Sequence, residues 1–174
     1  MAGIIVFILC AAVSSSPLSL FLAVFVHEAG HMLCAALLHM GFPRLKINAV
    51  GMRVLYGAPA YGARRAALCL SGPLAGAVFA AVFFRFRFFF LYSMGFSLIN
   101  LVPVSCFDGG GALAALCDAV FLPDTSVRVQ KTVSVISVII LWALSVLVQL
   151  RAGANLSLMV LCCAAVVAIL TDRA

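Results

Sequence analysis

The feature that most constrains this chain is a metal-binding pattern inside an apolar stretch. His27-Glu28-Ala29-Gly30-His31 lies within an apolar run from about Leu18 to Met40. An ionisable side chain near the centre of a bilayer costs about 2.5–3.5 kcal/mol on insertion scales, so such a cluster is by default a functional site. On a helix, positions i and i+4 share a face, so His27 and His31 can bind one ion while Glu28, the only glutamate, lies beside them. The pattern predicts a zinc-dependent hydrolytic site at membrane depth.

The composition places the rest of the chain in a membrane as well. Of its 174 residues, 66% are hydrophobic and 9% are charged, which excludes an ordinary soluble domain. Because a span needs about 20 apolar residues, we expect about six transmembrane helices. The predicted fold class is therefore an all-α polytopic membrane protein. It forms a single domain over residues 1–174, with a core at about 18–120 and additional C-terminal helices at about 133–170.

The apolar runs and the basic residues between them predict the spans and their orientation. The expected spans cover about residues 1–13, 18–40, 65–84, 88–104, 133–150 and 155–170. Pro103 and the glycines at 109–111 make one uninterrupted helix through the fourth stretch unfavourable. With both termini in the cytoplasm, eight of the eleven Lys and Arg lie on the cytoplasmic side, which fits the positive-inside rule. The basic residues are spread over the connecting segments, so the net charge of +6 does not indicate a nucleic-acid partner.

The segment from Arg44 to Tyr56 departs from the helical pattern. Polar and apolar residues alternate in its first half and Gly51 lies near its centre, which predicts a short membrane-associated β-hairpin after the second span. Its free edge can accept an extended peptide as an added strand; the alternative is a plug at the membrane surface. The predicted substrate-binding residues are Arg44, Leu45, Lys46, Ile47, Val54 and Pro103.

A catalytic zinc site needs a third protein ligand, and Asp108 is the best candidate. It is a carboxylate followed by glycines, which let backbone approach an ion closely. The alternative is an N-cap for the following helix. Glu28 is the predicted general base, and Asn100 is predicted to bind a developing oxyanion or the substrate backbone. The alternative for Asn100 is an interhelical hydrogen bond.

At these residues the chain resembles the site-2 protease family of intramembrane zinc metalloproteases. The family's HExxH is similar to His27–His31, and its NPxPxxxxDG segment is similar to Asn100–Gly110. The resemblance implies Zn²⁺ as cofactor, three core helices that carry the site, a β-hairpin after the HExxH helix, and hydrolysis of membrane-embedded or membrane-proximal peptide bonds in regulated proteolysis. The family often has Gly-Pro-x-x-Asn in the third core helix, where this chain has Gly76 instead of the asparagine. The compact form looks most like the sporulation stage IV protease branch.

Two other classes of function fit part of this pattern. A metal-ion channel or transporter would use intramembrane His and Asp residues as an ion path, and it would place ionisable residues at several depths. A catalytically silent metal-binding scaffold would not need Glu28. Here the ionisable residues converge on one site with one candidate base, which favours the protease. The expected partners are a membrane-protein or membrane-proximal peptide substrate, the lipid bilayer and a regulatory membrane partner. The expected location is the bacterial cytoplasmic membrane.

Overall fold

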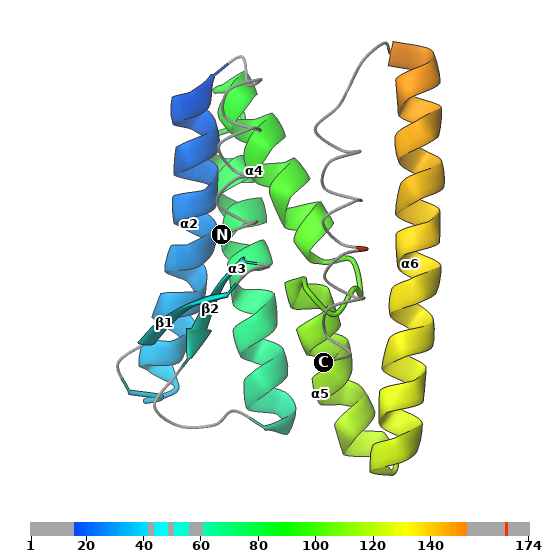
Figure 1. Cartoon of the computed structure of the whole chain (residues 1–174). Helices are drawn as coiled ribbons and strands as arrows, with labels where there is room; N and C mark the ends of the chain where they lie inside the picture. The colour runs from blue at the N-terminus through cyan, green and yellow to red at the C-terminus, as the bar shows by residue number, and fades with distance from the viewer. Residues whose placement is uncertain (1–15, 42–43, 49–50, 56–60, 153–165, 167–174) are drawn as a thin grey trace.

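The computed structural model describes residues 16–41, 44–48, 51–55, 61–152 and 166. Its regular elements are, in chain order, α2 (Pro17–Leu37), β1 (Arg44–Asn48), β2 (Gly51–Leu55), α3 (Gly62–Val82), α4 (Arg87–Asn100), α5 (Asp108–Val120) and α6 (Pro123–Ala152), as Figure 1 shows. The span expected at about residues 1–13 lies outside the described residues, as does the one at about 155–170 except for Val166.

Three of the described helices, α2, α3 and α6, are long and apolar enough to cross a membrane. The first two match the second and third expected spans to within a few residues. The third begins earlier than predicted, because α6 starts at Pro123 rather than near residue 133. Asp124, Arg128 and Lys131, expected in a connecting segment, therefore lie on the helix. At 1.5 Å per residue a 30-residue helix is about 45 Å long, enough for an apolar span with a polar extension.

The fourth expected span is divided, as Pro103 and the glycines predict. Helix α4 ends at Asn100, residues 101–107 form a loop, and α5 begins at Asp108. With 14 and 13 residues, the two helices are about 21 and 20 Å long, shorter than the hydrocarbon core of about 30 Å. The break places the start of α5 inside the helical bundle rather than at its edge (Figure 1).

The packing of the helices is typical of a protein surrounded by lipid. Large apolar side chains point outward, for example Phe25 at 61% and Leu33 at 63% exposed. The contacts between helices use small residues instead. A Cβ on Gly30 of α2 would lie 2.6 Å from both the Ser71 carbonyl oxygen and the Ala75 Cβ of α3, so only glycine allows this approach. Lipid gives no hydrophobic drive to bring helices together, so close backbone contact of this kind has to hold them.

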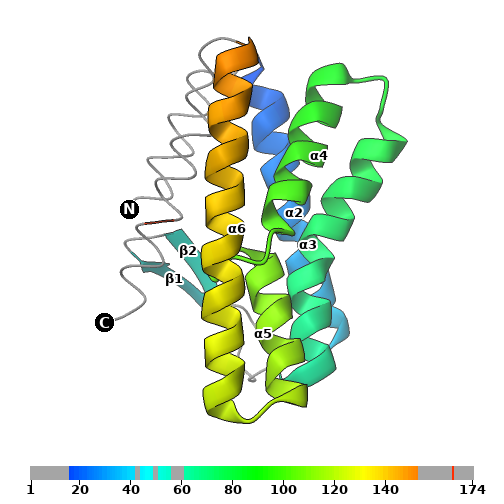
Figure 2. The ribbon, with the colours of Figure 1, turned by 90° about the vertical axis from the view of Figure 1, so that its right-hand side faces the viewer.

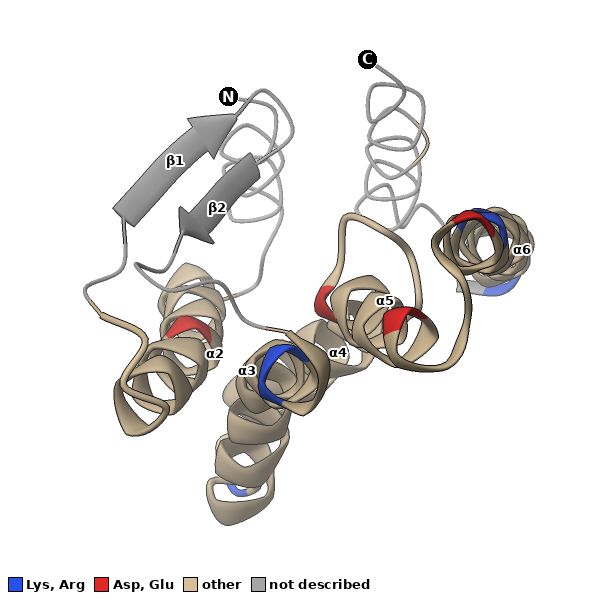
Figure 3. Cartoon of the chain, turned by 90° about the horizontal axis from the view of Figure 1, so that it is seen from below, with Lys and Arg blue, Asp and Glu red and all other residues tan. Residues whose placement is uncertain are grey.

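Helices α2, α3 and α4 pack against one another, α5 packs against α3, and α6 packs against α5. Figure 3 shows α5 standing between α3 and α6, and Figure 2 shows α6 along the outside of the bundle. Three of the contacts of α6 come from residues spaced by eight and four positions. Ser126 donates to the Asp118 carboxylate at 2.6 Å, Ser134 donates to the Pro103 carbonyl at 3.3 Å, and Val138 packs against Val104. Helix α6 thus holds both α5 and the loop that precedes it.

The predicted hairpin segment contains two paired strands. β1 and β2 run antiparallel, with Arg44 opposite Leu55, Lys46 opposite Arg53 and Asn48 opposite Gly51. The connecting residues 49–50 lie outside the described part of the chain, as does Tyr56. The association of the strands with the membrane and with a substrate stays a prediction.

Candidate metal centre

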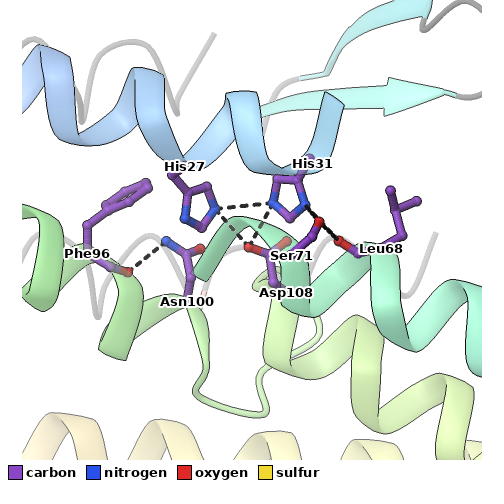
Figure 4. Close-up of polar contacts among 7 residues, drawn as sticks. All are labelled: His27, His31, Leu68, Ser71, Phe96, Asn100 and Asp108. Carbon is purple, nitrogen blue, oxygen red and sulfur yellow. Dashed lines mark hydrogen bonds and ion pairs between the residues drawn. The ribbon is translucent and has the colours of Figure 1, made fainter. Parts of the chain in front are cut away.

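Three potential ligand atoms meet where α2, α3 and the start of α5 come together. His27 and His31 lie one turn apart on α2 and are 2% and 9% exposed. Asp108 is the first residue of α5. Its Oδ2 lies 2.9 Å from His27 Nε2 and 3.2 Å from His31 Nε2, and the two Nε2 atoms are 3.2 Å apart (Figure 4). Among the described residues these three form the one group of His, Cys, Asp or Glu side chains close enough to share an ion.

The spacing of these atoms fits zinc. Bonds of about 2.0–2.1 Å to nitrogen and oxygen in a tetrahedral arrangement place neighbouring ligand atoms about 3.3 Å apart. The observed separations of 2.9, 3.2 and 3.2 Å are close to this value. Two imidazole nitrogens and one carboxylate oxygen are also a donor set that catalytic zinc uses, with a fourth position left for water. The three residues therefore fit the metal that the sequence predicts.

The backbone of α3 sets the orientation of His31. Its Nδ1 lies 2.8 Å from the Leu68 carbonyl oxygen. A carbonyl only accepts, so Nδ1 of His31 carries the hydrogen and, in the neutral ring, the lone pair is on Nε2. This is the form of histidine that binds a metal through Nε2. Gly72 makes the approach possible, because any Cβ there would overlap the imidazole of His31.

His27 is held differently. Its ring packs edge-on against Phe96 of α4 with ring centroids 4.8 Å apart, and its Nδ1 is buried with no hydrogen-bond partner among the described residues. Packing and the contact with Asp108 thus define the position of His27, whereas a hydrogen bond to α3 defines that of His31. The two histidine rings are therefore not held in the same way, because only the ring of His31 has a hydrogen bond on Nδ1 within the described residues.

Asp108 reaches the histidines because the loop before it folds tightly around the start of α5. A Cβ on Gly109 would collide with the Leu101 carbonyl, and one on Gly110 would collide with the Val104 carbonyl. The N-cap of α5 is Phe107, and the Asp108 carboxylate points to the histidines rather than capping the helix. Its negative charge in the first turn also interacts favourably with the helix dipole.

Glu28 and Asn100 lie next to this cluster without joining it. Glu28 follows His27 on α2, is partly buried, and is not part of the group formed by His27, His31 and Asp108. The Asn100 amide nitrogen donates to the Phe96 carbonyl at 2.9 Å, one turn back along α4 (Figure 4). The interhelical hydrogen bond considered for Asn100 is thus replaced by one within its own helix.

The other predicted site residues are placed only in part. Pro103 lies in the loop before Asp108, and its carbonyl accepts the hydrogen bond from α6. The strands that carry Arg44, Leu45, Lys46, Ile47 and Val54 are present, while their side chains lie outside what the structure describes. Sequence reasoning missed the Leu68 carbonyl, Ser71 and Phe96. The sequence signal in this region is the run of mostly small residues at 71–76, which is typical of close helix packing rather than of support for a ligand.

Comparison with known proteins adds two findings. The sequence model of peptidase family M50 matches residues 77–144, a stretch that includes Asp108 and excludes both histidines. The fold is similar to that of the Site-2 Protease from Methanocaldococcus jannaschii, with a TM-score of 0.67, 16% sequence identity, and coverage of 98% of this chain and 86% of that one. The family match covers less than half of the chain, and in its fold the chain resembles the site-2 protease family. No curated protein matches it.

The match to peptidase family M50 and the likeness in fold agree with the three helices that are long and apolar enough to cross a membrane. The matched region and the HExxH segment come from different parts of the chain, and the fold brings them to one point. The departure at Gly76 also has a structural counterpart. A Cβ there would collide with the Ser97 hydroxyl of α4, and the Gly76 carbonyl accepts a hydrogen bond from Ser93 at 2.9 Å. Gly76 therefore lets α4 pack directly on α3.

Proposed function

We propose that this protein is an intramembrane zinc metalloprotease that hydrolyses peptide bonds within or near transmembrane segments of membrane proteins, as part of regulated proteolysis. The observation that carries the proposal is the convergence of His27 Nε2, His31 Nε2 and Asp108 Oδ2 inside an apolar bundle. An intramembrane cluster of ionisable groups is too costly to be retained without a function. These three side chains also provide the three protein ligands that a catalytic zinc ion normally has.

In this proposal His27, His31 and Asp108 hold the zinc, and the neighbouring residues carry out the proton transfers. Bound zinc supplies Lewis-acid chemistry, which polarises a carbonyl and makes water a better nucleophile near neutral pH. Glu28 takes a proton from the attacking water as the new C–O bond forms. It then returns the proton to the leaving amine as the peptide C–N bond breaks. Asn100 has a second N–H beyond the one given to Phe96, and we assign it to the developing oxyanion or the substrate backbone.

The membrane arrangement is part of the same proposal. We place the chain in a bacterial cytoplasmic membrane with about six spans and both termini in the cytoplasm, because the basic residues between the apolar runs are biased to that side. The segment from Arg44 to Leu55 then lies on the cytoplasmic side of the membrane, where the second span ends.

The direct experiment is co-expression with candidate single-span membrane proteins. The proposal predicts that at least one candidate is cut by the wild type and stays intact with the Glu28→Gln variant, whereas identical cleavage by both proteins would contradict it. The size of this effect is considered in the Discussion.

The strands provide a second test, directed at substrate binding. Proline at Ile47 or Val54 removes a backbone donor and disfavours the strand, so each variant should cut substrate more slowly than the wild type. Zinc content should stay the same, because both positions lie outside the metal centre. Unchanged cleavage in both variants would remove the strands from substrate docking. Zinc loss would instead mean that the strands support the fold of the site.

A further inference from the structure

A hydroxyl group on α3 lies beside the hydrogen bond that orients His31. The Ser71 hydroxyl donates to the Leu68 carbonyl at 2.7 Å, and the same carbonyl accepts from His31 Nδ1 at 2.8 Å. The Ser71 oxygen itself is 3.4 Å from His31 Nδ1. The imidazole N–H of His31 therefore faces two acceptors on one turn of α3, and both appear in Figure 4.

The local sequence of α3 explains why this turn can accept a side chain from α2. Pro73 lies inside α3 and has no N–H, so it cannot donate to the Cys69 carbonyl four residues earlier. Gly72 has no Cβ, so the His31 ring can lie directly against the backbone. Ser71 then offers its oxygen at the edge of that contact. Ser71 and Gly72 thus form the part of α3 that the His31 imidazole contacts.

We propose that Ser71 is a positioning residue of the metal centre: with the Leu68 carbonyl it fixes the His31 imidazole so that Nδ1–H faces α3 and the Nε2 lone pair faces the zinc. With its own O–H directed at Leu68, the Ser71 oxygen turns its lone pairs toward His31. This support matters more here because His27 has no equivalent partner on Nδ1 within the described residues. The inference rests on the proposed zinc function and names how one ligand is held.

The test compares two serine variants of the full-length protein in detergent. Ser71→Ala should weaken zinc binding about tenfold, the lower end of the 10–100-fold loss typical when a group behind a ligand is removed, since the Leu68 carbonyl remains. Zinc affinity is measured by competition with a chelator of known affinity. The visible spectrum of the Co²⁺-substituted protein should also change, because it reports the ligand geometry. Ser71→Thr, which keeps a hydroxyl, should restore both.

Ser93→Ala is the matched control. The Ser93 hydroxyl is buried and also donates to a carbonyl of α3, that of Gly76, but it contacts no ligand. This variant should lose similar stability and keep the zinc affinity and Co²⁺ spectrum of the wild type. Wild-type zinc affinity in Ser71→Ala, or equal loss in both serine variants, would overturn the inference while leaving the zinc site intact. A wild-type protein that binds no zinc would overturn the proposed function itself.

Discussion

Replacing Glu28 by glutamine is expected to reduce cleavage by about 10²–10⁴-fold, the range lost when a general base is removed. The amide has the shape of the carboxylate but cannot take a proton from water. Zinc content should stay at the wild-type level, because Glu28 is outside the group formed by His27, His31 and Asp108. The measurements are the rate of substrate cleavage and the metal content of the same purified sample.

The cleavage rate and the metal content of the Glu28 variant test different parts of the proposal. Wild-type cleavage by Glu28→Gln would contradict the assignment of the base. A folded variant that had lost its zinc would place Glu28 among the ligands instead. The thermal unfolding midpoint in detergent, measured with and without added zinc, identifies a folded protein and shows whether it still binds the metal.

Gly72→Ala is expected to remove zinc and to lower cleavage by at least about 10²-fold, the scale reached when reacting groups are misplaced by about 1 Å. The nearest atoms to a Cβ at this position all belong to the His31 ring, with Cε1 at 2.6 Å and Cδ2 at 2.8 Å. Moving α2 away from α3 would break the close contact at Gly30, so we expect the ring to move rather than the helices. His31 Nε2 then leaves the point shared with His27 and Asp108.

Gly95→Ala on α4 is the matched control for this substitution. A Cβ on Gly95 meets nothing within 4 Å, so alanine there should bind zinc and cut substrate as the wild type does. It should also stabilise the helix by about 0.5–1 kcal/mol, since glycine is a poor helix former. Zinc content and cleavage at wild-type levels in Gly72→Ala would show that α3 does not pack on His31 as described. Loss of zinc in both glycine variants would remove the specific role of Gly72.

The candidate site residues could be predicted from the sequence because each is marked by a local pattern. Histidines at i and i+4 share a helix face whatever the tertiary structure. A carboxylate followed by glycines, at the end of an apolar stretch interrupted by proline, predicts a break where the chain can approach an ion. Alternation around Gly51 likewise predicted the pairing of β1 and β2.

The support of the ligands could not be predicted in the same way. The Leu68 carbonyl is a backbone group that every residue type has, so its role cannot be read from the sequence. Ser71 and Gly72 are small residues, and small residues occur at any close contact between helices. Helix α6 starts earlier than the sequence predicts, because Asp124, Arg128 and Lys131 are typical of a polar connection. Charged residues indicate exposure to water, and a helix that extends beyond the membrane satisfies them as well as a loop does.

The most direct test of the central claim is zinc-edge X-ray absorption on the purified wild-type protein in detergent. With His27, His31 and Asp108 as ligands, the protein should contain about one zinc per chain. Its first shell should consist only of nitrogen and oxygen at about 2.0–2.2 Å, with the scattering pattern of two imidazole rings. A sulfur ligand at about 2.3 Å would instead assign part of the site to a cysteine such as Cys69 or Cys106. That result, or a protein without zinc, would contradict the account.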